Sequence, residues 1–340
     1  MEYDWERLPS SHAAAIRWAV PDREGIIDPM PTAPIASSPR LDWAGVPEPV
    51  RRSVEAALGS SIVSTVTQVG GFSPGAAVRA VLADGRRVFV KACGSALNPD
   101  TPDLNRAEIL ALGLLPGSVP APQLLTSYDD GDWVALVLED VEGRRPGLPW
   151  GPADVTSMTT SLGRVAGTTA PAPLRTFAVA TNVLTGWDEV EADPVGLDRD
   201  VARRLPEMLE HQALAGDVTV GSALVHWDAR NDNVLVRPDG EAVLLDWAWA
   251  CSGAPWLDTL LLAVDFVVQG GPDPHDFLRT AALTCDVPDR DLRAVVACVV
   301  GVWTDRARRP VPPGLPTIRE WQAHCARETL RWLDDGAWRR

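Results

Sequence analysis

The stretch over residues 224–250, LVHWDARNDNVLVRPDGEAVLLDWAWA, constrains this chain more than any other. Within it, His226, Asp228 and Asn233 follow the order H-x-D-x-x-x-x-N. Two apolar runs come next, NVLVR and AVLLDW, and the Pro-Asp-Gly between them supplies turn chemistry, so the pair predicts a β-hairpin. Such a hairpin brings Asn233, at the start of its first strand, close to Asp246 at the end of its second.

These four polar positions match what phosphoryl transfer needs from a protein. That reaction requires a carboxylate beside the attacking hydroxyl and oxygen ligands that hold magnesium against the nucleotide phosphates. Asp228 would serve the hydroxyl, and Asn233 and Asp246 would hold the metal. The alternative, ordinary polar loop residues before a surface hairpin, requires the spaced trio and the later acid to coincide by chance.

The stretch resembles the aminoglycoside phosphotransferase and choline kinase-like family, whose members share an H-G-D-x-x-x-x-N catalytic loop and a later I-D-W or D-x-D metal acid. The resemblance implies a catalytic role for Asp228, metal binding by Asn233 and Asp246, and structural support from His226. The chain departs from the family at Trp227, where glycine is usual, and we expect this ring to rearrange local packing and narrow the substrate mouth. Protein kinases match less well, because no D-F-G or A-P-E motif follows.

Composition restricts the kind of protein. The 340 residues suffice for two lobes and a large core, and 46% hydrophobic with 23% charged residues is ordinary for a soluble globular protein. A net charge of −15 argues against nucleic acid as a partner. The apolar runs are too short to span a bilayer, the N-terminus is acidic where a signal peptide is basic, and five cysteines without a C-x-x-C pair indicate a reducing compartment. We therefore expect a cytoplasmic protein without a membrane partner.

Residues 1–45 end in a Pro- and Ser-rich stretch and are predicted to be an arm or linker on the domain surface. Residues 46–141 would form a nucleotide-binding lobe that begins with a short helix, and residues 142–340 a catalytic and substrate-binding lobe.

Between residues 60 and 92, alternating apolar residues predict a strand, a glycine-rich loop and a hairpin. One interpretation of Gly71, Ser73 and Gly75 is a loop whose backbone amides cover nucleotide phosphates. The other is the G-x-S-x-G nucleophile elbow of serine hydrolases. That motif requires a helix directly after the serine, whereas Pro74 and a strand pattern follow here.

Lys91 is the only lysine in the chain, since every other basic side chain apart from histidine is arginine. A compact ammonium on a flexible stem suits contact with the α- and β-phosphates. The following segment, TPDLNRAEILALGLL, has helical spacing and places Glu108 in mid-helix. The resemblance implies that Glu108 pairs with Lys91, against the alternative of a solvated helix face.

The segment PQLLTSYDDGDWVALVLEDVEG predicts two strands joined by an Asp-Gly turn and running into Glu139, Asp140 and Val141. The resemblance implies a hinge between lobes here, where the main chain of Glu139 and Val141 would hold the adenine edge.

The second lobe is predicted to be mainly helical. The acidic stretch GWDEVEADP is expected to be a solvated loop between two helices. The apolar helix after the catalytic hairpin contains Asp258, which matches an acid that the family uses to brace its catalytic loop. Of the fourteen tryptophans, Trp247, Trp249, Trp256 and Trp303 are expected in or beside the site, most of them as core and one or two as walls of the acceptor pocket.

The resemblance extends over residues 60–335 and implies an α+β, two-lobed protein-kinase-like fold. The small lobe would hold an antiparallel sheet and one long helix, and the larger lobe would be mainly helical. The expected function is phosphorylation of a hydroxyl on a small molecule, dependent on Mg²⁺ and on ATP, with GTP not excluded. A pseudokinase that binds nucleotide without turnover, suggested by Trp227, and a serine hydrolase using Ser73 are the alternatives. The oligomeric state stays open.

The helices after Asp246 carry about as many arginines as acids, together with Trp303, Trp321 and Trp332. A polycationic acceptor would favour an excess of carboxylates, because each ammonium needs an acceptor once water is removed. We therefore expect a hydroxylated acceptor of modest charge with an apolar or planar portion, an antibiotic or another secondary metabolite, and place aminoglycosides second.

Overall fold

A computed structural model describes Ser38 and residues 40–339 of the chain. The chain divides into the units Met1–Thr32 and Ala33–Arg340, and all described residues belong to the second. The arm predicted for residues 1–45 thus lies largely outside the described residues. Its last residues differ from a surface arm, because Trp43, in the 3-10 helix Trp43–Gly45, is only 6% exposed and packs in the core of the small lobe.

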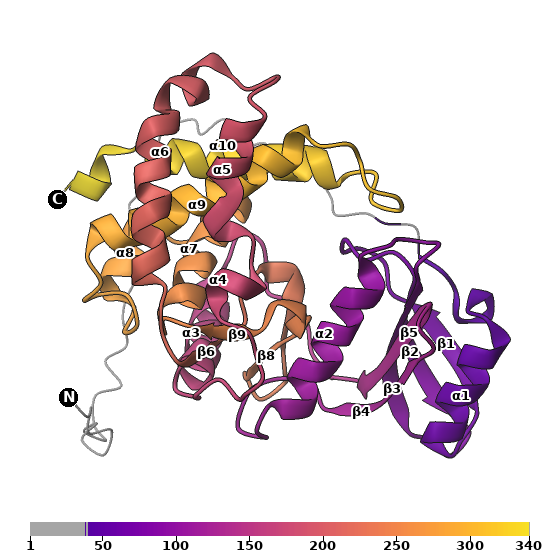
Figure 1. Cartoon of the computed structure of the whole chain (residues 1–340). Helices are drawn as coiled ribbons and strands as arrows, with labels where there is room; N and C mark the ends of the chain where they lie inside the picture. The colour runs from indigo at the N-terminus through magenta and orange to yellow at the C-terminus, as the bar shows by residue number, and fades with distance from the viewer. Residues whose placement is uncertain (1–37, 39, 340) are drawn as a thin grey trace, which may run out of the picture. The chain divides into compact units, whose positions relative to one another are not determined.

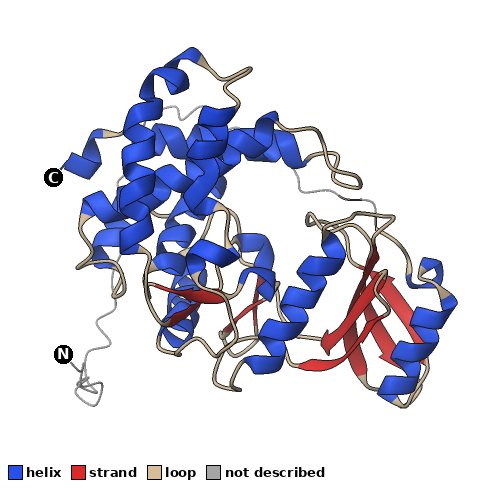
Figure 2. Ribbon diagram, in the orientation of Figure 1, coloured by secondary structure: helices blue, strands red, loops and turns tan. Residues whose placement is uncertain are grey.

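The small lobe is built on a five-stranded antiparallel sheet in the order β1-β2-β3-β5-β4. Figure 2 draws the strands of this sheet in red. The predicted hairpins form β2 with β3 and β4 with β5, and two helices accompany the sheet. The elements are β1 (Ile62–Thr67), β2 (Ala76–Leu82), β3 (Arg87–Gly94), β4 (Leu124–Asp129), β5 (Trp133–Glu139), α1 (Glu48–Leu58) and α2 (Thr101–Leu114).

The two-residue alternation of β3 decides which side chains reach the site. Val88 and Val90 point into the small-lobe core together with Val50 and other residues of α1. Successive side chains of a strand point to opposite faces of the sheet. Phe89 and Lys91 therefore face the other way, toward the large lobe, where both line the main cavity.

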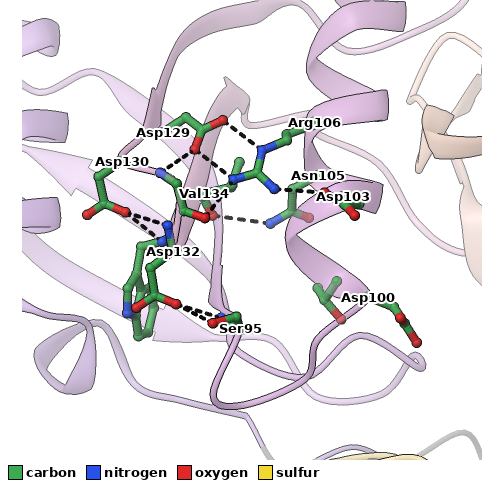
Figure 3. Close-up of polar contacts among 12 residues, drawn as sticks. Ser95, Asp100, Asp103, Asn105, Arg106, Asp129, Asp130, Asp132 and Val134 are labelled. Atoms are coloured by element: carbon green, nitrogen blue, oxygen red, sulfur yellow. Dashed lines mark hydrogen bonds and ion pairs between the residues drawn. The ribbon is translucent and has the colours of Figure 1, made fainter.

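Polar contacts to the β4–β5 hairpin hold α2 in place (Figure 3). The guanidinium of Arg106 bridges Asp129, at 2.8 Å, and Asp103, at 2.7 Å, and the side-chain amide of Asn105 donates to the carbonyl of Val134 at 3.2 Å. These bonds fix the rotation of the helix about its axis. Glu108, two positions after Arg106 and therefore on the other side of the helix, is thereby kept facing Lys91 of β3.

The large lobe is mainly helical, with two short strand pairs, as Figures 1 and 2 show. The predicted catalytic hairpin is present as β7 paired with β8, while β6 pairs with β9 and ties the two ends of the catalytic stretch together. The elements are α3 (Pro152–Ala166), α4 (Phe177–Ala180), α5 (Gly186–Ala192), α6 (Arg199–Val218), β6 (Ala223–Val225), β7 (Val234–Val236), β8 (Ala242–Leu244), β9 (Cys251–Gly253), α7 (Leu257–Gln269), α8 (Pro274–Thr280), α9 (Asp289–Arg308) and α10 (Ile318–Leu333), with 3-10 helices at Val183–Thr185, Asn231–Asn233, Trp247–Trp249 and Gly336–Arg339.

The acidic stretch GWDEVEADP corrects one prediction, because its first seven residues form α5 instead of a solvated loop. Trp187 at the start of α5 is fully buried, and its indole N–H donates to the carbonyl of Ala297 at 2.7 Å. Gly301 on α9 makes room for the ring, since a Cβ there would lie 2.7 Å from the indole nitrogen. Burial of one large aromatic ring thus outweighs the polar composition of its neighbours.

None of the described helices is both long and apolar enough to cross a membrane. The longest apolar segments, α7 and most of α9, instead form the core of the large lobe.

Candidate active site

A cavity of about 850 Å³ is lined by residues of both lobes. Nine of the residues predicted from the sequence contribute to its wall: Gly71, Ser73, Lys91, Glu108, Glu139, Val141, Asp228, Asn233 and Asp246. The other three, Gly75, His226 and Asp258, lie outside the wall. The structure therefore brings residues from five separate segments of the chain around one space.

Lys91 lies between two carboxylates. Its Nζ is 2.7 Å from Glu108 Oε2 and 3.4 Å from Asp246 Oδ1. Burial acts to lower the pKa of Lys91, but the charges of Asp246 and Glu108 outweigh it and hold that pKa above its usual value. Lys91 is therefore a permanent cation, joining the small-lobe sheet, α2 and the end of the catalytic hairpin.

Asp258, at the start of α7, holds the beginning of the catalytic loop. Its two carboxylate oxygens accept the backbone N–H groups of His226 and Trp227, each at 2.8 Å. The buried ring of His226 continues the connection, with Nε2 2.9 Å from the carbonyl of Leu245 and Nδ1 accepting the N–H of Asp228 at 3.2 Å. Burial lowers the pKa of His226, so the ring is neutral and suited to donating at one nitrogen and accepting at the other.

A second carboxylate of α7 anchors the other end of this loop and was missed from the sequence. Asp265 Oδ2 accepts the backbone N–H of Asn231 at 3.1 Å and the indole N–H of Trp150 at 2.8 Å. Burial raises the pKa of Asp265 to about 7. A sequence signal was present, because Asp258 and Asp265 are the only charged residues of the apolar helix LDTLLLAVDFVVQ and their spacing of seven puts them on one helix face.

The carboxylate of Asp228 is held from both sides. The Nε–H of Arg230 donates to its Oδ1 at 2.6 Å, and the side-chain amide of Asn233 donates to its Oδ2 at 2.7 Å. Burial raises the pKa of Asp228 despite the opposing charge of Arg230, and a carboxylate of raised pKa is a better proton acceptor. Arg230 was not singled out from the sequence, because a cation within the loop carries no spacing signal.

The donor set at the end of the cavity suits magnesium. Asp246 supplies carboxylate oxygens and Asn233 an amide oxygen, and Mg²⁺ typically takes one or two such protein ligands and completes its shell with phosphates and water. The described part of the chain contains no cluster of three or more His, Cys, Asp or Glu side chains that could hold a metal ion.

One residue of this donor set, Asp246, and one residue of the catalytic loop, Trp227, have a strained backbone. Trp227 has φ 58° and Asp246 has φ 65°, and they are the only non-glycine residues with positive φ among those described. Such conformations persist only where the surroundings impose them, and they concentrate at functional sites. The structure thus keeps, with a tryptophan, the left-handed turn that glycine would form without strain at position 227.

The glycine-rich loop between β1 and β2 is held by Arg40, a residue that the sequence assigned to the arm. The guanidinium of Arg40 donates to the carbonyls of Gly70 and Ser73 and lines the cavity. Gly70 and Gly75 have positive φ, of 90° and 102°, and a Cβ at Gly75 would lie 2.4 Å from a carbonyl of β3. Only tertiary contact reveals Arg40, since no local pattern links it to the loop.

The hinge predicted at residues 139–141 is tied to its surroundings by arginines. Glu139 pairs with Arg237 at 2.7 Å, and Arg79 donates to the carbonyl of Val141 at 3.2 Å. Apolar side chains line the cavity beside the hinge and provide a surface suited to a flat ring: Ala77, Phe89, Leu138, Leu235 and Leu245.

The tryptophans expected near the site divide into buried core residues and residues that line the cavity. Of the four expected in or beside the site, Trp247 and Trp256 are buried core, whereas Trp249 and Trp303 line the cavity. Trp321 also lines it, 5.8 Å from Trp303 in an edge-on arrangement. Of the C-terminal tryptophans considered for the acceptor pocket, Trp332 packs elsewhere, against His275 and Trp338.

The geometry around Ser73 does not support a nucleophile elbow. The serine is followed by β2 instead of a helix, and no hydrogen bond among the described residues joins its hydroxyl to a histidine. Its backbone carbonyl is bound by Arg40 and by the hydroxyl of Ser38. The other interpretation, a loop whose backbone amides cover nucleotide phosphates, stays a prediction.

The sequence matches the model of one protein family over most of its length. Residues 70–295 match the model of the phosphotransferase enzyme family. Comparison of the sequence with curated proteins gives no match.

Solved structures share the fold. Choline kinase LicA from Streptococcus pneumoniae is similar over 84% of this chain and 98% of its own, with 14% identity and a TM-score of 0.58. An aminoglycoside phosphotransferase from Alicyclobacillus acidocaldarius is similar over 80% of this chain and 90% of its own, with 16% identity and a TM-score of 0.53. A thermostable mutant of aminoglycoside phosphotransferase APH(4)-Ia, in a ternary complex with ADP and hygromycin B, is similar over 83% of this chain and 98% of its own, with 13% identity and a TM-score of 0.54. These likenesses confirm the α+β, two-lobed kinase-like fold.

Proposed function

The chain belongs to the phosphotransferase enzyme family and is a small-molecule kinase with an alcohol group as acceptor, and from this we propose that it transfers the γ-phosphoryl group of ATP with the help of Mg²⁺. One observation carries the proposal. The Lys91 ammonium joins Glu108 and Asp246 at one side of the cavity, and the held carboxylate of Asp228 lies in the same wall. A phosphate-binding cation, a metal acid and a base are the three parts this reaction needs.

We assign the roles as follows. Lys91 holds the α- and β-phosphates, Glu108 holds Lys91, and the backbone of the glycine-rich loop covers the phosphates, with Arg40 fixing the loop. Asn233 and Asp246 would hold Mg²⁺, which neutralises charge on the phosphates when bound. His226, Asp258 and Asp265 keep the catalytic loop in shape through hydrogen bonds to its backbone.

Asp228 receives the proton in the transfer step. As the acceptor oxygen bonds to the γ-phosphorus, the bond between that phosphorus and the β–γ bridging oxygen breaks, and ADP leaves with the electron pair. The hydroxyl proton passes to Asp228, whose Oδ2 is oriented by Asn233 and whose basicity is raised by burial.

ATP is proposed as the phosphoryl donor for two reasons. The apolar wall of the cavity at the hinge fits a purine ring, and the similar structure of APH(4)-Ia was solved in complex with ADP. Thermal shift with each nucleotide in turn distinguishes GTP from ATP. For the acceptor we retain a hydroxylated antibiotic or another secondary metabolite of modest charge, although the related structures include a choline kinase and a complex with hygromycin B. Free cysteines, four of the five buried, support a cytoplasmic location.

Nucleotide binding tests the proposal directly. Thermal shift with ATP, GTP or no nucleotide, each with and without Mg²⁺, should show stabilisation by ATP, about 2.7 kcal/mol at a hundred times the dissociation constant. Lys91→Ala should remove most of that shift. Arg86→Ala is the matched control, because it removes one cation from an exposed site on the same hairpin.

Turnover separates the kinase from a pseudokinase. ATP consumption is followed across aminoglycosides, macrolides, nucleoside antibiotics, peptide antibiotics, choline and homoserine. Phosphorylation of one of them supports the proposal, and Mg²⁺-dependent binding without turnover of any would favour the pseudokinase. Absence of nucleotide binding in wild-type protein would contradict both.

A further inference from the structure

The cavity extends beyond the catalytic base to a wall made by α9 and α10, which lie side by side (Figure 1). A chain of contacts leads there from Asp228. The guanidinium of Arg230, which bonds Asp228, lies 5.0 Å above the ring of Trp321, and that ring contacts Trp303. We call the cavity-lining residues of the two helices at this end the acceptor wall: Trp303, Arg306, Arg319, Trp321 and Gln322.

Arg306 has no counterion within the described part of the chain. It makes no hydrogen bond or ion pair with any described residue, although it is partly buried. The nearest acid in sequence, Asp305, is used by other arginines, at 2.8 Å from Arg309 and 3.6 Å from Arg308. Burial and the neighbouring charge of Arg319 lower the pKa of Arg306 more than the nearby charge of Asp305 raises it.

Arg319 is bound only through neutral groups. Its Nε and Nη2 donate to the carbonyl of Pro310 at 3.0 and 2.8 Å, and its Nη1 donates to Gln322 Oε1 at 2.8 Å. No carboxylate of a described residue lies within ion-pair distance of it. By contrast, Arg230 in the same cavity is paired with Asp228. The acceptor wall therefore carries two guanidinium groups that form no ion pair with a described residue. The one acid whose charge reaches both, Asp305, is already paired with Arg308 and Arg309.

This local charge opposes the overall charge of the molecule, which is −15. Charges farther away than about 8–10 Å are screened by salt, so the distant acids do not compensate two partly buried guanidinium groups. An ammonium on a ligand would meet repulsion at this wall. A carboxylate or phosphate would meet fork-shaped donors that match its geometry, beside aromatic faces suited to a planar group.

We propose that the acceptor carries an anionic group, a carboxylate or a phosphate, which Arg306 and Arg319 bind while its planar portion lies against Trp303 and Trp321. This inference rests on the proposed function, since it concerns the acceptor of that same site. It narrows the class from a molecule of modest charge to an anionic hydroxylated one. Polycationic aminoglycosides are excluded by the same charges.

Four probes with one ring and one primary alcohol test the charge. They are 4-(hydroxymethyl)benzoate, 4-(hydroxymethyl)phenyl phosphate, 4-(hydroxymethyl)benzamide and 4-(hydroxymethyl)benzylamine, titrated calorimetrically into full-length protein saturated with ADP and Mg²⁺, so that the nucleotide site is filled. At least one anionic probe should bind about tenfold or more tightly than the amine, because charge-assisted bonds replace repulsion. Comparison of the two anions distinguishes carboxylate from phosphate recognition.

Arg306→Gln should reduce the affinity for the preferred anion about tenfold and leave that for the amide within about twofold. This variant removes no hydrogen bond or ion pair within the described protein, whereas Arg319→Gln also frees the carbonyl of Pro310. The far-UV circular dichroism and melting temperature of Arg306→Gln should match those of wild type. Arg290→Gln, which changes an arginine that is 78% exposed outside the cavity, is the matched control for net charge and should behave as wild type.

Failure of the inference differs from failure of the proposed function. If ADP binds with Mg²⁺ but neither anion binds more tightly than the amine, or if Arg306→Gln keeps the full preference, the inference is overturned and the kinase assignment stands. If ADP does not bind, the proposed function itself is contradicted, and this inference with it.

Discussion

Replacement of Trp227 measures the strain stored in the catalytic loop. Its backbone is left-handed, with φ 58°, and its ring is 8% exposed and packed edge-on against Phe177 at 4.5 Å. The left-handed conformation costs an L-residue ~1–2 kcal/mol, a cost that glycine avoids. Glycine loses ~0.5–1 kcal/mol more backbone entropy than alanine on folding. The balance favours glycine over alanine at this position by roughly 0.75 kcal/mol, within a span of about 0–1.5 kcal/mol.

Both Trp227→Gly and Trp227→Ala should be less stable than wild type, by ~3–5 kcal/mol, because either leaves a cavity where the ring packed. The glycine variant should nevertheless be the more stable of the two. Urea unfolding followed by far-UV circular dichroism, with comparable slopes, gives the difference in midpoint. Trp256, equally buried at 8% exposed but with φ −91°, is the matched control, and there alanine should be the more stable replacement.

The reasoning is refuted if alanine equals or exceeds glycine at position 227 while the pair at Trp256 shows the ordinary order. That result would mean that the loop relaxes to negative φ when the ring is removed. The hydrogen bonds that the backbone N–H groups of His226 and Trp227 donate to Asp258 would then not impose the turn.

Three further results are expected. Asp228→Asn should lower turnover by about 10²–10⁴-fold with nucleotide affinity changed only a few-fold, since Asp228 meets the acceptor; near wild-type turnover would remove it as the base. Asp246→Ala should abolish the Mg²⁺ dependence of nucleotide binding in calorimetric titration, and an unchanged dependence would contradict its role as metal ligand. Burial raises the pKa of Asp265 to about 7, so the folded state keeps a proton that the unfolded chain releases at about pH 4. The contribution of this group to the free energy of unfolding is therefore lost as pH rises from about 4 to 7. Thermal melts should therefore show Asp265→Asn gaining on wild type across that window, and parallel curves would contradict the shift.

Local pattern was sufficient to predict the parts of the site whose positions depend on short segments. The spacing of His226, Asp228 and Asn233 lies within one loop, and the hairpin that follows carries Asp246 back beside them. The alternation of β3 and the helical spacing of α2 likewise determine which way Lys91 and Glu108 face. These side chains are placed by backbone periodicity, which a sequence displays directly.

Other features depend on contacts between segments far apart in the chain, and no local pattern encodes such contacts. Arg40 reaches the glycine-rich loop across thirty or more positions. Trp187 turns an acidic stretch into a helix with one buried face, because α9 provides space for its ring. The sequence supplies arginines and tryptophans in both C-terminal helices. Only their packing decides that Trp321 and Arg306 line the cavity while Trp332 is used in the core, because burial of each side chain depends on which helix face meets its neighbour.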